Sequence, residues 1–313
     1  MTEPVIAVVG PTAAGKSELA LRLAVEIGGE IVNADSMQLY TGMDIGTAKL
    51  PVAQRRGVPH HLLDIWDVRQ TASVAEYQRL ARDAIADIQR RGLFPVLAGG
   101  SGLYLRAALD PLRFPGTDPA LRARLEAELA QSGPAALHRR LTGLDPAAAA
   151  AILPSNGRRI VRALEVIELS GQPFDATLPE YESVYPEVQI GLAVDRAELD
   201  RMIAGRTARM FTTGLVEEVT GLARVGLREG RTASRALGYA QVLRFLDGEY
   251  SLEEACAQTI LATRRFARRQ EAWFRRDPRV TWLPAGADDL AGQALATIGS
   301  CGSPRDTAPR TTL

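Results

Sequence analysis

The segment from residue 10 to residue 17 reads Gly-Pro-Thr-Ala-Ala-Gly-Lys-Ser and constrains this chain more than any other segment. The β-branched run Val5–Val9 precedes it, and an apolar helical pattern follows from Ser17 to about residue 27. In such a strand–loop–helix, glycines let backbone N–H groups converge on phosphate oxygens, and the positive end of the helix dipole points at the same place. The sequence therefore predicts a phosphate-binding loop (P-loop) for a di- or triphosphate, formed by Gly10, Pro11, Thr12, Ala13, Ala14, Gly15, Lys16 and Ser17.

Two side chains of this loop have tasks that follow from their chemistry. Lys16 supplies a mobile positive charge for the terminal phosphate, and the Ser17 hydroxyl is a ligand for Mg²⁺. Of the 37 lysines and arginines, only Lys16 and Lys49 are lysines. Because the chain otherwise uses arginine, a lysine in this loop disfavours the interpretation of Lys16 as an ordinary surface charge. For Lys49, only its position in a second glycine-containing loop supports a role.

Strands and helices alternate in the first part of the chain. A capping box at Ser73 and Glu76 opens a helix that runs to about residue 91. Buried strands are expected at 30–34, 94–98 and 188–194, with further candidates at 62–65 and 279–283. This alternation predicts an α/β fold with a P-loop NTPase-like parallel sheet flanked by helices.

The pattern changes near residue 112, where prolines and glycines punctuate the chain and only helical patterns follow. Helices are expected at 118–131, 134–142, 145–153 and 156–170. The sequence therefore predicts a catalytic core over residues 1–112 and 188–298 and an all-helical insertion domain over 113–187. The tail 299–313, rich in Pro, Ser, Thr and Arg, is expected to be disordered.

Asp35 follows the expected strand 30–34. A helix over 17–28 travels roughly 18 Å away from the P-loop, and the strand returns about 16 Å. Asp35 is therefore expected at the carboxyl edge of the sheet, where ligands bind in open α/β folds. There it can hold Mg²⁺ through water, or act as a general base on a nucleophile approaching the bound phosphate. The alternative is a capping or Asx-turn aspartate, because Asp-Ser after a strand is also ordinary turn chemistry.

The loop Gly99-Gly-Ser-Gly102 follows another strand and is expected at the same edge. Its glycines permit close approach of a ligand, and Ser101 can donate a hydrogen bond to it; a tight strand-to-helix turn is the plainer interpretation. This strand ends in Gly99, where a nucleotide hydrolase often carries a metal-binding aspartate. The chain is therefore poorly equipped for nucleotide hydrolysis.

Arginines cluster in two places. The stretch 264–276 holds six arginines and three aromatic residues in one expected helix, and Arg158, Arg159 and Arg162 form a smaller group in the insertion. Arginine suits phosphate backbones, and interleaved aromatic side chains suit base stacking or core packing. A solvated helix face with buried aromatic residues explains the same pattern, and both interpretations can hold together.

Composition limits the class of protein. The 313 residues carry equal numbers of acidic and basic side chains, no apolar stretch long enough to cross a bilayer, and two cysteines. The start lacks the basic segment of a signal peptide. These features predict a cytoplasmic protein without membrane contact or disulfides, and His60-His61 is expected to be structural because no third metal ligand lies nearby in sequence.

Several motifs recur together between residues 5 and 283: the P-loop, Asp35-Ser-Met-Gln-Leu-Tyr40, Gly42-Met-Asp-Ile-Gly-Thr-Ala-Lys49, Pro59-His-His-Leu-Leu-Asp64, Gly99-Gly-Ser-Gly-Leu-Tyr104, Arg162-Ala-Leu-Glu-Val166, Gly238-Tyr239 and Thr263-Arg-Arg-Phe-Ala-Arg-Arg-Gln270. Together they resemble the bacterial tRNA dimethylallyltransferases, P-loop prenyltransferases that modify an adenosine beside the anticodon. Ser17 and Ser101 stand where threonine is common, which keeps the hydroxyl. Arg206 fits the family spacing, whereas Arg201 is one place off.

The resemblance implies transfer of a dimethylallyl group from dimethylallyl diphosphate to the N6 amine of the adenosine 3′ of the anticodon. It implies Mg²⁺ on Ser17, pyrophosphate in the P-loop, Asp35 as base, and Lys16, Ser101 and Arg206 as further catalytic residues of a monomer. The residues implied to contact tRNA are Asp35, Ser36, Met37, Gln38, Ser101, Arg124, Arg158, Arg159, Ile160, Val161, Arg162, Arg235, Gly238, Tyr239, Arg264 and Arg268.

Three other functions stay open from the sequence. A small-molecule kinase fits the P-loop but gives no reason for Asp35-Ser-Met-Gln38. A prenyltransferase acting on free AMP or ADP does not need the helical insertion or the arginine helix. A non-catalytic RNA-binding module with a relic P-loop does not need Lys16 and Asp35, and both are present.

Overall fold

A computed structural model of the protein describes residues 2–175 and 179–301. Its sheet has six parallel strands in the order β3-β2-β4-β1-β5-β6. The strands are β1 (Val5–Val9), β2 (Gly29–Asn33), β3 (His60–His61), β4 (Phe94–Ala98), β5 (Glu187–Ala193) and β6 (Val280–Pro284). The predicted α/β fold with a parallel sheet is confirmed, and β1, the strand that leads into the P-loop, lies between β4 and β5.

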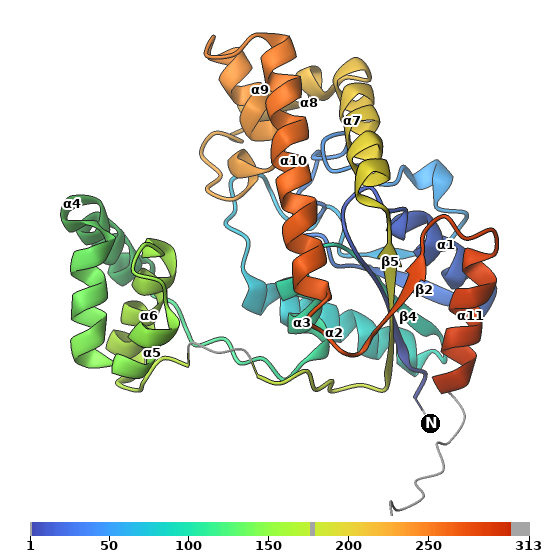
Figure 1. The fold of residues 1–313 in the computed structure, drawn as a ribbon, viewed down its shortest axis with the longest axis horizontal. Helices are drawn as coiled ribbons and strands as arrows, with labels where there is room; N and C mark the ends of the chain where they lie inside the picture. Colours follow the sequence, from blue (N-terminus) through green and yellow to red (C-terminus); the bar gives the residue numbers. More distant parts are fainter. Residues whose placement is uncertain (1, 176–178, 302–313) are drawn as a thin grey trace, which may run out of the picture. The chain divides into compact units, whose positions relative to one another are not determined.

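Helices cover both faces of this sheet. The helices α1 (Lys16–Ile27) and α11 (Leu290–Cys301) pack on one side, and α2 (Val74–Arg90) and α3 (Gly102–Leu109) on the other (Figure 1). A parallel strand covered on both faces needs apolar side chains in both directions. This explains the uninterrupted run Val5–Val9, all of which is fully buried.

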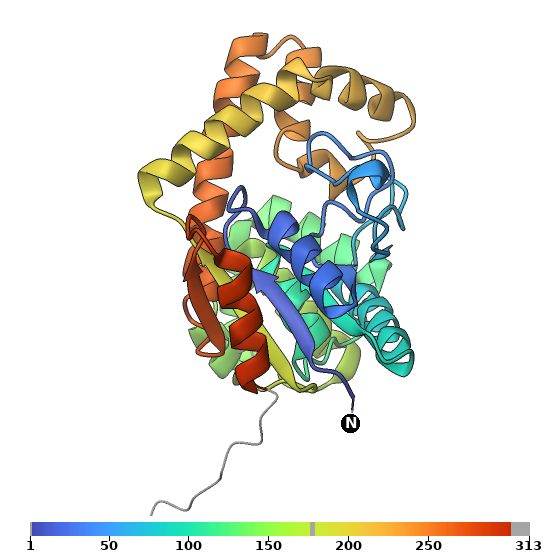
Figure 2. The ribbon, with the colours of Figure 1, turned by 90° about the vertical axis from the view of Figure 1, so that its right-hand side faces the viewer.

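Four more helices gather beyond the carboxyl ends of the strands, as Figures 1 and 2 both show. They are α7 (Arg196–Thr212), α8 (Leu215–Arg224), α9 (Tyr239–Leu246) and α10 (Leu252–Phe274). A capping box starts α10: Ser251 Oγ accepts from the Glu254 N–H at 3.1 Å, and the Glu254 carboxylate accepts from the Ser251 N–H at 2.7 Å. This group of helices stands over the edge of the sheet where ligands bind in α/β folds.

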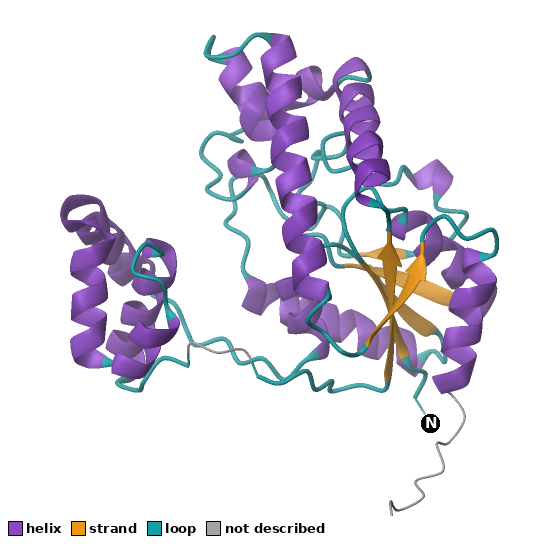
Figure 3. Cartoon of the chain, in the orientation of Figure 1, coloured by secondary structure: helices purple, strands orange, loops and turns teal. Residues whose placement is uncertain are grey.

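The chain divides into two compact units, one of Met1–Asp110 with Ser183–Leu313 and one of Pro111–Glu182. Within its described residues the second unit is all helical (Figure 3), with α4 (Pro119–Leu144), α5 (Pro146–Ala151) and α6 (Gly157–Ser170). It has its own core, which includes Leu125, Leu141 and Ile160. Gly133 leaves helical geometry at φ 76° and ψ 165°, so α4 is two helices at the predicted break.

Two sequence predictions need correction. The candidate strand at 62–65 is wrong, because Leu62 and Asp64 adopt left-handed backbone at φ 62° and 57°; the edge strand is the preceding His60–His61. The predicted disordered tail begins too early, since α11 continues to Cys301, and residues 302–313 lie outside the described residues. No helix in the described parts of the chain is both long and apolar enough to span a membrane.

Candidate active site

The P-loop curls between β1 and α1 as the sequence predicts. Gly10, Ala13 and Gly15 take left-handed backbone at φ 134°, 69° and 90°, which turns successive N–H groups to one side. The helix begins at Lys16, so its positive end faces the same space. The loop is therefore shaped to bind a phosphate through its backbone.

The Lys16 side chain is folded over this loop, with Nζ 2.7 Å from the Pro11 carbonyl oxygen. Burial lowers the pKa of Lys16 to about 8, the Asp35 carboxylate opposes that shift, and the Arg206 guanidinium adds to it. Asp35 and Arg206 therefore both act electrostatically on the Lys16 ammonium. One carboxylate and two cations therefore share this edge of the sheet.

We predict proton uptake when inorganic pyrophosphate binds above pH 8. The Lys16 ammonium is present below about pH 8 and is lost as the pH rises through that value, and a bound polyanion draws the proton back because it favours the charged form. Calorimetry in buffers of different ionisation enthalpy, at about pH 8.5, should detect uptake of up to about one proton. Lys16→Met is the control: equal uptake by that variant would contradict the prediction.

Asp35 lies just beyond β2 and is held from both sides. Its N–H donates to Asn33 Oδ1 at 2.9 Å, and its own Oδ1 accepts from the Met37 N–H at 2.9 Å. Asp35 therefore makes the Asx turn that the sequence offered as the alternative. It also exerts its charge on Lys16 and Arg206 across the site. The turn uses one carboxylate oxygen, so it does not conflict with the predicted role of Asp35 in the site.

The glycine loop after β4 lies beside this segment. Ser101 Oγ accepts from the Ser36 N–H at 3.1 Å and donates to Ser36 Oγ at 3.2 Å. Its N–H donates to the Ala34 carbonyl at 3.3 Å. Ser101, predicted as a catalytic and RNA-contacting residue, is thus placed where it positions residues 34–36.

Arg206 reaches the P-loop from α7. Its Nη2 donates to Thr12 Oγ1 at 2.8 Å, whereas its Nε is buried without a hydrogen-bond partner in the described chain. Burial lowers the pKa of Arg206, and Asp35 counteracts that shift. A buried, unpaired guanidinium N–H beside a phosphate loop is suited to an anionic ligand. Arg201, by contrast, is exposed and pairs with Glu198 on its own helix at 2.7 Å.

Two residues of the site were missed by the sequence analysis. Gln270 of α10 is buried; its Oε1 accepts from the Thr12 N–H at 2.8 Å, and its Nε2 donates to the Gly100 carbonyl at 2.9 Å. A Cβ on Gly100 would lie 2.1 Å from that nitrogen, so a larger residue there would displace the Gln270 carboxamide. Asn33, also buried, donates to the carbonyls of Asp35 and Leu62, each at 3.0 Å.

A usable signal for Gln270 exists in the sequence. It falls in the buried stripe of α10 formed by Thr263, Ala267, Gln270 and Phe274, which recur at three- and four-residue spacing. A polar amide on the buried face of a helix needs hydrogen-bond partners. In this case the partners are two phosphate-site loops.

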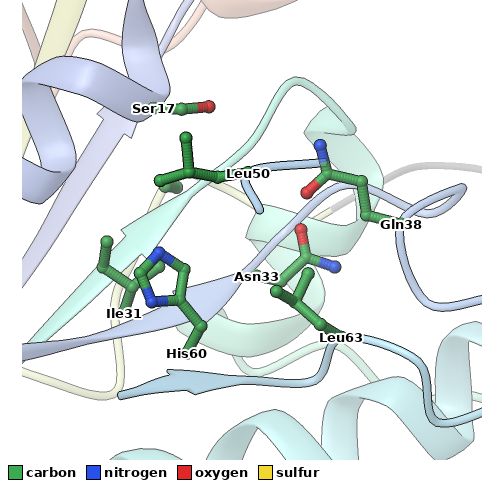
Figure 4. Close-up of a pocket in the computed structure, with 8 residues that line it drawn as sticks. Ser17, Ile31, Asn33, Gln38, Leu50, His60 and Leu63 are labelled. Carbon is green, nitrogen blue, oxygen red and sulfur yellow. The ribbon is translucent and has the colours of Figure 1, made fainter. Parts of the chain in front are cut away.

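A pocket opens beside the P-loop at the carboxyl ends of β2 and β4. Figure 4 shows Ser17, Asn33 and Gln38 directed toward it, with apolar walls around them; the lining is Ser17, Ile31, Asn33, Gln38, Leu50, His60, Leu63 and Ala98. The Ser17 hydroxyl is exposed and makes no hydrogen bond within the described chain. The predicted role of Ser17 as a metal ligand is compatible with this position.

The arginines of the insertion have unequal surroundings. Arg158 and Arg159 are exposed at the start of α6, and Arg124 is exposed but pairs with Glu168. Arg162 donates to the Gly116 and Pro115 carbonyls at 3.0 and 2.6 Å and to the buried Glu165, so its guanidinium fastens the insertion's own structure. Glu165 is buried, which by itself raises its pKa, yet its hydrogen bonds to Arg122, Thr117 and Arg162 bring the pKa down to about 2.

Four of the predicted RNA contacts are buried in this structure. Ile160 and Val161 pack in the core of the insertion, because they occupy the inward face of α6 between the exposed arginines. Tyr239 is fully buried and donates to Glu218, so its side chain has no surface to offer RNA. Gly238, also buried, is the N-cap of α9.

Other predicted contacts do lie on the surface of the core unit. Arg235 is exposed in the 3₁₀ turn Ala233–Arg235, and Arg268 is exposed on α10. Arg264 is half-buried and donates to the Asp200 carbonyl of α7 at 3.2 Å. Met37 and Gln38 are half-buried, and Gln38 lines the pocket described above.

Lys49 and the paired histidines are structural. Buried Lys49 Nζ donates to the Tyr40 carbonyl at 3.0 Å and to the carboxylates of Asp44 and Asp64 at 2.7 and 2.5 Å. His61 contacts the Glu30 carboxylate at 2.7 Å, and His60 contacts the Val58 carbonyl at 2.8 Å. The expectation of a structural role for His60-His61 agrees with these contacts.

Similar proteins and structures have related names. A 66% identical protein from Thermobifida fusca matches over 94% of each chain, and a 67% identical protein from Streptomyces coelicolor matches over 91% of each; both are called tRNA dimethylallyltransferase. A crystal structure of a tRNA isopentenylpyrophosphate transferase from Bacillus halodurans is 40% identical, with a TM-score of 0.70 and 95% of each chain covered. A eukaryotic dimethylallyltransferase acting on tRNA, at 24% identity, shares the fold with a TM-score of 0.81, covering 98% of this chain and 82% of its own.

The family comparison agrees with these relatives. The model described as IPP transferase matches residues 38–277, which include Gln38 of the pocket, the glycine loop, Arg206 and Gln270. The match spans most of the chain and takes in the insertion. On this match and these identities, the chain belongs to the IPP transferase family, as an enzyme of the tRNA dimethylallyltransferase type.

Proposed function

We propose that this enzyme transfers the dimethylallyl group of dimethylallyl diphosphate to the exocyclic N6 amine of the adenosine immediately 3′ of the anticodon in tRNA, releasing pyrophosphate. One observation carries the proposal: the Asp35 carboxylate acts electrostatically on Lys16 of the phosphate loop and on Arg206, whose Nη2 donates to Thr12 of the same loop. A base and a diphosphate cradle on one sheet edge are what an alkyl transfer from a diphosphate to an amine requires.

The chemical step follows from this arrangement. The N6 nitrogen forms a bond to the allylic carbon while the carbon–oxygen bond to the diphosphate breaks, and the electron pair leaves with pyrophosphate. Asp35 takes the N6 proton, using the carboxylate oxygen that is not engaged by the Met37 N–H. The P-loop amides, Lys16 and Arg206 hold the negative charge that grows on the leaving group, and such preorganised charge is where catalytic stabilisation is usually largest.

Mg²⁺ fits this site by its donors. The free Ser17 hydroxyl beside the P-loop is a hard oxygen ligand, and Mg²⁺ commonly keeps water and substrate phosphate oxygens as its other ligands. Mg²⁺ bound there would neutralise part of the diphosphate charge. No cluster of three or more His, Cys, Asp or Glu residues suited to a metal occurs in the described chain, so the site depends on the diphosphate itself.

The RNA would be bound by exposed basic surfaces in both units. Arg158 and Arg159 of the insertion, with Arg235 and Arg268 of the core unit, are the predicted contacts that lie on the surface. An adenine stacked in the anticodon loop must leave the stack to reach a pocket of this kind. We expect such a protein to act as a monomer in the cytoplasm.

The test is a mass measurement. Purified protein with Mg²⁺, dimethylallyl diphosphate and an adenosine-bearing anticodon stem-loop should increase the RNA mass by one dimethylallyl group and release pyrophosphate. Consumption of ATP with an unchanged RNA mass would support a small-molecule kinase instead. Prenylation of AMP or ADP at equal efficiency would support a free-nucleotide prenyltransferase. Neither alternative is favoured by the names of the relatives.

A further inference from the structure

The loop that contains Asp44, Ile45 and Gly46 is held by one carboxylate of α8. Glu218 Oε2 accepts from the Asp44 and Ile45 N–H groups at 3.1 and 2.7 Å, and Oε1 accepts from the Gly46 N–H at 3.2 Å. Three consecutive backbone donors on one side chain fix the loop firmly relative to α8, because each is a charge-assisted hydrogen bond. The loop therefore takes its position from Glu218.

Tyr239 completes this attachment from α9. Its hydroxyl donates to Glu218 Oε1 at 2.5 Å, and its ring packs on the loop so closely that a Cβ on Gly46 would lie 2.4 Å from ring Cε2. Burial, together with the Glu218 charge, raises the pKa of Tyr239, which keeps the hydroxyl protonated and donating. The motifs at 42–49 and 238–239 are far apart in sequence but contact each other in the structure.

The loop in turn orients Gln38. The residue after Gly46 is Thr47, and its carbonyl accepts from Gln38 Nε2 at 3.1 Å. Gln38 reaches the pocket that Ser17 also lines (Figure 4). A glutamine carboxamide has two N–H donors and one acceptor oxygen. With one N–H given to Thr47, the side chain still offers one donor and one acceptor.

That remaining pair has a chemical meaning. A glutamine that presents one donor and one acceptor side by side complements the N7 acceptor and N6 amino donor of adenine, whereas guanine presents two acceptors at the same edge. Rotation of the carboxamide about its terminal bond would reverse the order of donor and acceptor. The hydrogen bond to Thr47 resists this rotation, so a correctly placed loop selects for adenine.

We propose that Glu218 and Tyr239 are positioning residues that act through loop 44–47 on Gln38, and that Gln38 so held reads an adenine edge of the RNA. The proposal rests on the proposed function, because it names how the acceptor side of that site is arranged. The two residues lie outside the donor side, where Lys16 and Arg206 attend the diphosphate. Their loss should therefore weaken the use of RNA and leave the use of dimethylallyl diphosphate intact.

The test compares Glu218→Gln with Glu217→Gln, a change at an exposed glutamate next to it on α8. We expect Glu218→Gln to lower kcat/KM for the stem-loop by at least about tenfold, with the KM for dimethylallyl diphosphate and binding of pyrophosphate unchanged. It should also reduce the preference for adenosine over guanosine beside the target. Glu217→Gln should match the wild type. Tyr239→Phe keeps the ring on Gly46 and should lower kcat/KM for the stem-loop by a smaller factor. If Glu218→Gln does not fold, Tyr239→Phe is the variant that tests the proposal.

A double variant separates positioning from general damage. If Glu218 acts through Gln38, then Glu218→Gln combined with Gln38→Ala should be no worse than Gln38→Ala alone. Losses that multiply, or an equal rise in the KM for dimethylallyl diphosphate, would overturn the proposal. A wild-type protein that never prenylates RNA would instead refute the proposed function, so the two failures are distinguishable.

Discussion

Asp35→Asn should lower kcat for RNA prenylation by about 10²–10⁴-fold, the usual contribution of a general base. Asparagine keeps the oxygen that accepts from the Met37 N–H at 2.9 Å, so the turn and the fold should survive. What is lost is the second carboxylate oxygen, which takes the proton from N6. Rapid-quench kinetics with saturating RNA should therefore show a slow chemical step, while stem-loop binding measured by fluorescence anisotropy stays within a factor of about two.

Asp67→Asn is a matched control for this change. Asp67 makes the same local turn, with Oδ1 accepting from the Arg69 N–H at 2.9 Å, but it is exposed and forms an ion pair with Arg69 at the surface. That variant should retain full turnover. If Asp35→Asn also retains it, Asp35 is only a turn residue. If it loses RNA binding in parallel with turnover, its role is recognition and not proton transfer.

Much of the fold could be predicted because local pattern and long-range structure agree. Val5–Val9 and Phe94–Ala98 are apolar runs that are each followed by a glycine, and both strands appear with those bounds. Ser73 likewise caps the start of a helix, with its Oγ accepting from the Glu76 N–H at 3.3 Å, which is one half of the predicted capping box. Where local pattern misled, at 62–65, an apolar run lies in a loop whose backbone conformation is set by distant partners: Asn33 donates to the Leu62 carbonyl, and Lys49 pairs with Asp64.

The site residues also fall into those that the sequence could place and those that it could not. Spacing along strand and helix was enough to bring Asp35 back to the P-loop, because both elements have a fixed rise per residue. The contact partners of Glu218 and Gln270 could not be predicted by spacing along one element. Each contacts a loop that lies 170 or more residues away in sequence, and no periodicity specifies which loop a helix will meet. The sequence grouped Arg158, Arg159 and Arg162. The structure leaves the first two exposed, whereas Arg162 donates to Glu165 and to two backbone carbonyls, a difference that the shared residue type did not reveal.

Gln270→Leu should lower kcat/KM for dimethylallyl diphosphate by about 10²-fold, because a displacement of about 1 Å in a positioned group costs that much. Leucine is close in size but leaves the Thr12 N–H and the Gly100 carbonyl without the partners that Gln270 gives them at 2.8 and 2.9 Å. The P-loop and the glycine loop then lose the one side chain seen to bridge them in the described chain. The loss should appear as weaker binding of inorganic pyrophosphate in calorimetry.

The control is Gln258→Leu, a change of the same type at an exposed position of the same helix. It should leave donor use unchanged. Gln270→Glu sharpens the argument, since it keeps an acceptor for the Thr12 N–H but turns a carboxylate toward the Gly100 carbonyl and the nearby Lys16 ammonium. Repulsion between that carboxylate and a diphosphate should make it at least as poor as leucine in donor binding, with stem-loop binding intact. If a Gln270 variant loses RNA binding but still binds pyrophosphate normally, Gln270 serves RNA binding by α10. The bridge between the two loops would then have no part in holding the donor.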